Sequence, residues 1–146
     1  MYDLATLSAR EEIKELKARY FRFADLHDFE GFGGLFTDDA IMESGKAGGP
    51  IGVAASGRAA IIELAKAASK GFIKVHHGHN GEITIHDPAN ASGIWSGEYS
   101  FFEDAPPNRC AMHTYAHYHD TFIKSGGVWL FSKVRIITIH ALVRPD

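Results

Sequence analysis

Six of the nine histidines in this 146-residue chain lie in two short stretches, His76–His79 and His113–His119. Imidazole titrates near neutral pH, so such a concentration indicates either proton transfer or metal binding. Both stretches have the composition of strands, and alternate residues of a strand point to opposite faces. His76 therefore shares a face with Phe72 and Lys74, and His77 lies on the other. The pattern alone leaves open which of these two histidines faces a pocket.

A carboxylate that could orient a histidine is Asp25, near the end of a predicted N-terminal helix. On a helical wheel it falls beside Phe21, at the margin of the apolar arc rather than in its centre. Asp25 is then either a flanking surface residue or a group that leans over the mouth of a pocket. In the second case it would orient a facing histidine and make it more basic.

Two helices are expected in the first half of the chain. From Ser8 to about His27, apolar residues recur at intervals of three and four, and Ser8 with Glu11 forms a capping box. A shorter helix is expected from Arg58 to about Ser69, between Gly57 and Gly71. The Gly-rich segment from Ser44 to Gly57 is expected to be irregular.

Strands are expected in the second half, where β-branched and aromatic residues dominate. Their predicted ranges are 72–77, 82–87, 91–103, 109–124 and 127–142. Turn residues at Asp87–Asn90 and Ser125–Gly127 predict hairpins. We therefore expect one α+β domain over residues 1–146, with the long helix laid across a curved antiparallel sheet. Such packing leaves room for a pocket.

Composition limits the partners. No apolar run approaches the ~18 residues of a membrane span, and no Lys or Arg cluster offers a surface for nucleic acid, so neither a membrane nor nucleic acid is expected. The net charge of −3 suits a small, uncharged or mildly anionic hydrophobic ligand. The single Cys110 and an N-terminus without a secretory signal pattern favour the cytoplasm.

Several short motifs occur in an order that resembles a known family. They are the segment from Tyr20 to Asp28, the run Leu35–Ala40, the pair His76 and Asn80, and Gly127–Phe131. Together they resemble the SnoaL-like branch of the nuclear transport factor 2-like superfamily, over nearly the whole chain. Within it, the chain is most similar to hexachlorocyclohexane dehydrochlorinases. Scytalone dehydratases and bile acid 7α-dehydratases are more distant.

The resemblance implies a cone-shaped α+β barrel with a deep pocket and a catalytic histidine–aspartate pair. Carried over position by position, the pair is His76 and Asp25. In such lyases the histidine takes a proton from a carbon next to a leaving group, the aspartate holds the imidazole, and no cofactor is needed. The long final strand pair and the resemblance together imply a homo-oligomer, for which a trimer is favoured and a dimer stays open.

The chain departs from the dehydrochlorinase pattern at two positions. The pocket lysine of those enzymes would fall at Tyr20, and their late arginine at Val134, with Arg135 on the opposite strand face. Halide removal is therefore disfavoured. Tyr20 with Asp25 and His76 instead resembles the bile acid dehydratase pattern, in which a tyrosine joins the pair. Tyr20 is equally compatible with a core role.

The sequence therefore predicts a cofactor-independent lyase or isomerase acting on a small cyclic apolar substrate. His76 is the expected general base, Asp25 its partner, and Tyr20 and Tyr118 polar contacts. The expected apolar lining is Phe23, Met42, Trp95 and Phe101.

Two other functions remain open. A metal site could use His77, His79 and Glu82, although the spacing to Glu82 is one residue short of the cupin motif it resembles. A non-catalytic ligand-binding or association module is the other alternative, because a fold alone does not specify a function.

Overall fold

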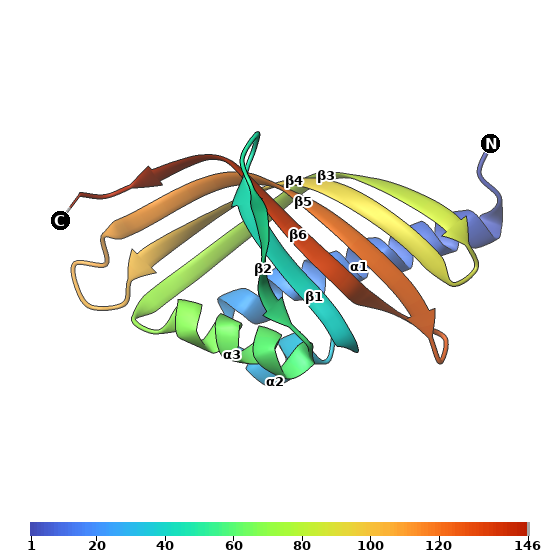
Figure 1. Cartoon of the computed structure of the whole chain (residues 1–146), viewed down its shortest axis with the longest axis horizontal. Helices are drawn as coiled ribbons and strands as arrows, with labels where there is room; N and C mark the ends of the chain where they lie inside the picture. Colours follow the sequence, from blue (N-terminus) through green and yellow to red (C-terminus); the bar gives the residue numbers. More distant parts are fainter. Residues whose placement is uncertain (146) are drawn as a thin grey trace.

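The computed structural model, which describes residues 1–145, contains a six-stranded, strongly curved sheet with helices against its concave face (Figure 1). The strand order is β2-β1-β6-β5-β4-β3. The strands are β1 (Phe36–Lys46), β2 (Ile51–Ser56), β3 (Phe72–Asp87), β4 (Asn90–Glu103), β5 (Cys110–Ser125) and β6 (Val128–Val143). The expected α+β class is confirmed. The expectation of an antiparallel sheet holds from β3 to β6, but β1 pairs with β6 in parallel, so the sheet is mixed.

The two predicted hairpins are present. The β3–β4 turn is closed by the Asp87 carboxylate, which accepts hydrogen bonds from Ala89 and Asn90. The β5–β6 turn uses Gly126 and Gly127, both with positive φ. The predicted strands 72–77 and 82–87 are one strand, since β3 continues through a bulge between His79 and Glu82.

The segment from Ser44 to Gly57, which was predicted to be irregular, contains the end of strand β1, a turn and the whole of strand β2. Strand β1 reaches Lys46, and β2 returns antiparallel to it after a short turn. The prediction was wrong because β2 is an edge strand with mostly exposed residues, so burial imposes no alternation on its sequence. The sequence also gave no indication of the one-and-a-half-turn helix α2 (Phe29–Gly33), which the Asp28 carboxylate caps.

Helix α1 (Leu4–Asp25) begins one turn earlier than predicted, because its N-cap is Asp3, whose carboxylate accepts the Thr6 N–H at 2.7 Å. Ser8 lies inside the helix and bonds to Glu12.

Helix α3 (Arg58–Ser69) has the predicted bounds. In Figure 1 the sheet arches over α2 and α3, and α1 runs behind β6. No helix within residues 1–145 has the length and apolar character that crossing a bilayer requires.

A buried ion pair joins α1 to the centre of the sheet. Lys17 Nζ lies 2.7 Å from Asp120 Oδ2, and neither side chain is more than 2% exposed. The ammonium also lies over the rings of Tyr20 and Tyr118, at 4.4 and 4.1 Å from their centroids. Burial lowers the pKa of Lys17 and raises that of Asp120, and the pairing opposes both shifts. Each charge is therefore tolerable only because the other is present.

We expect Lys17→Met to destabilise the fold by about 3–5 kcal/mol, because it leaves the Asp120 carboxylate buried and uncompensated. The double variant Lys17→Met/Asp120→Leu should recover most of this loss. Urea unfolding measures both. Lys14→Met is the matched control, because the half-exposed Lys14 is paired with an exposed Glu11 and should change stability by less than about 0.5 kcal/mol. Equal losses in the single and double variants would contradict a buried ion pair.

Candidate active site

Asp25 and His76 are joined by two contacts between the end of α1 and strand β3. Asp25 Oδ1 lies 2.6 Å from His76 Nδ1, and Oδ2 accepts the His76 backbone N–H at 3.0 Å. Strand β3 is the edge of the sheet, so this N–H has no partner strand. The Asp25 carboxylate therefore accepts a backbone N–H that would otherwise be unpaired, and it also fixes the imidazole ring of the same residue.

The contact determines the tautomer of His76. An ionised carboxylate can only accept, so Nδ1 carries the proton and Nε2 keeps its lone pair on the side of the ring away from Asp25. Burial lowers the pKa of His76, while the hydrogen bond and the charge of Asp25 act in the opposite direction. The His76 side chain is only 10% exposed. At neutral pH the imidazole is thus uncharged and able to accept a proton.

Two aromatic rings pack against the imidazole. Phe21 is nearly parallel to it, with centroids 5.7 Å apart, and Tyr99 of the neighbouring strand lies 5.2 Å away. Gly78 makes room for this packing, because a Cβ at that position would overlap the Phe21 ring. Sequence parity left His76 and His77 equivalent, and the fold resolves the choice: His76 turns inward and His77 is exposed.

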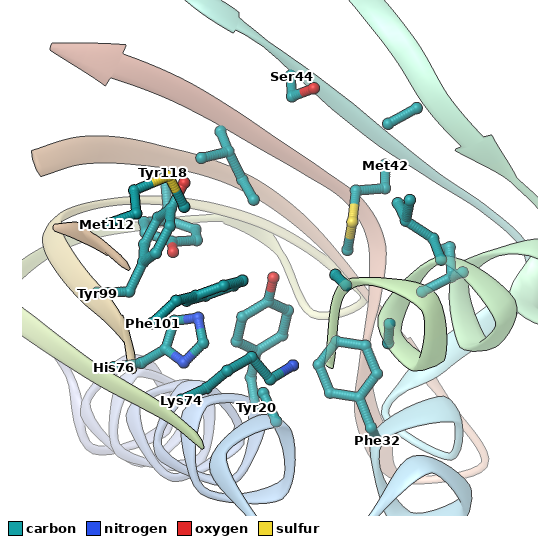
Figure 2. Close-up of a pocket in the computed structure, with 17 residues that line it drawn as sticks. Tyr20, Phe32, Met42, Ser44, Lys74, His76, Tyr99, Phe101, Met112 and Tyr118 are labelled. Carbon is teal, nitrogen blue, oxygen red and sulfur yellow. The ribbon is translucent and has the colours of Figure 1, made fainter. Parts of the chain in front are cut away.

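His76 borders a cavity of about 310 Å³ on the concave side of the sheet (Figure 2). Most of the wall is apolar. The lining side chains come from α1, α2, α3 and every strand: Tyr20, Ala24, Phe32, Met42, Ser44, Ala54, Ile61, Leu64, Ala65, Ala68, Lys74, His76, Tyr99, Phe101, Met112, Tyr118 and Ile136. This volume suits a ligand of one or two small rings.

Four of the six side chains predicted beside the pair line this cavity: Tyr20, Met42, Phe101 and Tyr118. Phe23 and Trp95 do not. On α1 the pocket face is formed by residues one turn apart, Tyr20 and Ala24, and Phe23 is turned to the flank beneath the Arg22 guanidinium. Trp95 packs edge-on against Phe122, 6.0 Å away, and borders a separate hollow beside Gly81.

The hydroxyl groups of Tyr20 and Tyr118 are both held in the protonated form. Burial is the main reason that the pKa of each phenol is raised, and the Asp120 carboxylate raises both further. Their rings meet edge to face, 6.2 Å apart. Two neutral phenols therefore belong to the lining of a largely apolar cavity.

Among the pocket residues that the sequence-based prediction missed, Lys74 is the one that can carry a charge. It lies two positions before His76 on β3, is 5% exposed, and lines the cavity. The signal was available, since residues i and i−2 of a strand share a face. By contrast, Arg135 stays outside, bonded to Glu43 at 2.6 Å, and the inward position beside it is the buried Val134.

The remaining histidines of the first cluster do not assemble a metal site. His77 and His79 are exposed, and His79 bonds to Glu98 at 3.1 Å on the outer face of the sheet. Within residues 1–145, no three His, Cys, Asp or Glu side chains are grouped so that they could hold an ion. The proposed ligands His77, His79 and Glu82 are therefore not brought together.

Comparisons with known proteins agree with this architecture. The sequence model of the SnoaL-like domain family matches residues 5–135. A comparison with curated proteins finds no match.

Solved structures extend the likeness over almost the whole chain. The hexachlorocyclohexane dehydrochlorinase LinA-type3 from Novosphingobium barchaimii is similar with a TM-score of 0.78 and 19% identity, covering 99% of this chain and 96% of that one. A proposed scytalone dehydratase from Novosphingobium aromaticivorans gives a TM-score of 0.81 and 20% identity, covering 97% and 91%. Identities this low establish the shared NTF2-like fold and nothing about substrate.

Proposed function

The chain belongs to the SnoaL-like domain family, and we propose that it is a cofactor-independent lyase or isomerase in which His76 removes a proton from a carbon of a small, cyclic, largely apolar substrate. The observation that carries the proposal is the 2.6 Å contact between Asp25 and His76 Nδ1 beside an apolar cavity. It supports a neutral base whose Nε2 is available to the ligand.

Each residue has a defined part in the proposed reaction. His76 Nε2 accepts the proton, and Asp25 stabilises the imidazolium that forms. The returned proton goes to a leaving hydroxyl in a dehydration, or to another carbon in an isomerisation. Tyr20 and Tyr118 donate hydrogen bonds to a substrate oxygen. The apolar walls exclude water and make these charges interact more strongly than in solution.

The test uses turnover and proton exchange. The protein is incubated in D₂O with cyclic ketones, cyclic β-hydroxy ketones and halogenated cycloalkanes, and mass spectrometry follows deuterium uptake and elimination. We expect exchange or elimination with a carbonyl compound, and a kcat reduced roughly 10²–10⁴-fold in His76→Gln and Asp25→Asn. Asp39→Asn, which alters an exposed carboxylate on β1, is the control.

Full activity in Asp25→Asn would refute the proposed pair. Tight binding of these compounds with neither exchange nor elimination would favour the non-catalytic binding module.

The His76 titration gives a second prediction. Because its folded pKa is lowered, His76 should stay neutral, with the proton on Nδ1, until the pH is below the ordinary range of histidine. The unfolded chain binds this proton first, so His76 costs stability as the pH falls from its unfolded to its folded pKa. In Asp25→Asn the midpoint should move lower still, since the interaction that raises the pKa is lost. Histidine-ring NMR measures both, and an upward move would contradict the pairing.

We also propose that the protein works as a homo-oligomer, a trimer rather than a dimer. Apolar side chains remain exposed where β6 ends beside β5: Tyr115, Ile139, Leu142 and Val143. Light scattering should give about three times the subunit mass of 16.0 kDa. Leu142→Glu should reduce this mass, whereas Val53→Glu on the edge strand β2 should not. A wild-type monomer would refute the assembly.

A further inference from the structure

Lys74 places a positive charge in the pocket, two residues before the proposed base on strand β3. It shares the inward face of β3 with His76, and in Figure 2 its side chain runs past Tyr20 into the space that His76 borders. Lys74 and His76 are the two members of the lining that can carry positive charge.

The Lys74 ammonium has no protein partner that accounts for its burial. Within residues 1–145, no carboxylate lies within 4.0 Å of it and no hydrogen bond is found for its Nζ. Its aromatic neighbour is Phe101, whose ring centroid is 5.9 Å away. Burial lowers the pKa of Lys74, and the charge of Asp25 acts in the other direction. A charge held this way costs stability, so a purely structural role does not explain it.

The other buried lysine shows what a structural solution looks like in this protein. Lys17 is more deeply buried, 1% exposed against 5% for Lys74, but it has Asp120 at 2.7 Å and does not line the main cavity. Lys17 therefore has a structural partner within the protein, whereas the partner of Lys74 must come from the ligand.

We propose that Lys74 binds the oxygen on which negative charge develops, and that the substrate is therefore a cyclic carbonyl compound with an acidic C–H next to its carbonyl. The inference rests on the proposed function, whose substrate class it narrows. As His76 Nε2 takes the proton, the C–H electron pair forms a carbon–carbon double bond and the carbonyl π pair moves to oxygen. The resulting enolate oxygen pairs with the Lys74 ammonium.

The enolate can then react in two ways. Its electrons return and expel a hydroxyl from the β-carbon, which leaves as water with the proton from His76. Alternatively, in a β,γ-unsaturated carbonyl compound the enolate is extended over the existing double bond, the same proton is added to the γ-carbon, and the double bond moves to the α,β position. Neither outcome requires an oxidant, a reductant or a metal.

The test uses a matched pair of probes, 4-nitrophenol and 4-nitroanisole, because a phenolate oxygen resembles an enolate oxygen and the methyl ether cannot ionise. Calorimetry gives each Kd, and the absorption spectrum gives the ionisation state of bound nitrophenol. We expect the wild type to prefer nitrophenol and to hold it as the phenolate. Lys74→Met should weaken nitrophenolate binding roughly 10–100-fold and leave nitroanisole unchanged, and Lys74→Arg should retain the preference.

Two further variants isolate the cause. His76→Gln removes the other possible positive charge and should keep the preference for nitrophenolate, which separates this inference from the proposed base chemistry. If His76→Gln keeps both the preference for nitrophenol and its turnover, the proposed role of His76 as base is refuted, while the inference about Lys74 stands. Thermal unfolding adds a second readout: Lys74→Met should raise Tm by a few degrees, whereas Lys17→Met should lower it.

The inference is overturned if the wild type shows no preference for nitrophenol over nitroanisole, including by binding neither. It is equally overturned if Lys74→Met weakens both probes alike, or if that variant lowers Tm and keeps the preference.

Discussion

The carboxylate of Asp25 is the contact on which the site depends. One oxygen accepts a backbone N–H from the exposed edge of the sheet, and the other holds the ring of the same residue, His76. An edge strand with free N–H groups could otherwise shift or pair with another chain. The two contacts together fix the position of the helix end against β3, and the tautomer and orientation of His76. Structural and chemical roles are therefore combined in one side chain.

The rest of the cavity follows from how α1 lies across the sheet. Residues one turn apart, Tyr20 and Ala24, face the pocket, and Phe21 stacks on the imidazole. The Lys17–Asp120 pair lies behind Tyr20 and Tyr118, and its ammonium contacts both rings. A buried ion pair adds little net stability, but it requires its two side chains to be held at well-defined positions. It keeps Tyr20 and Tyr118 in place while its own two charges stay outside the cavity lining.

Secondary structure could be predicted from the sequence where one buried face makes apolar residues recur at regular intervals, and it could not where no face is buried. The bounds of α3 and the hairpins from β3 to β6 could be predicted, because glycine turns and alternation mark them. Strand β2 is mostly exposed and α2 is very short, so neither leaves a periodic signal. Asp25 and His76 were selected by family resemblance rather than by pattern. Phe23 was misplaced because being apolar does not tell which side of a helix faces the cavity.

The position of Lys74 bears on the kind of chemistry the pocket can favour. In the dehydrochlorinases that the sequence resembles, the pocket lysine would correspond to Tyr20 on the helix, and here that position carries a neutral phenol. The positive charge in this pocket instead projects from the same strand as the base, two residues away. A cation so placed stabilises charge that forms close to the carbon losing its proton, because its effect falls with distance. In a carbonyl compound that charge appears on the neighbouring oxygen, whereas in an anti elimination of halide it leaves on the ring face opposite to the base. The presence of Lys74 in the same cavity as His76 therefore supports the proposed enolate chemistry, although the fold is shared with the dehydrochlorinases.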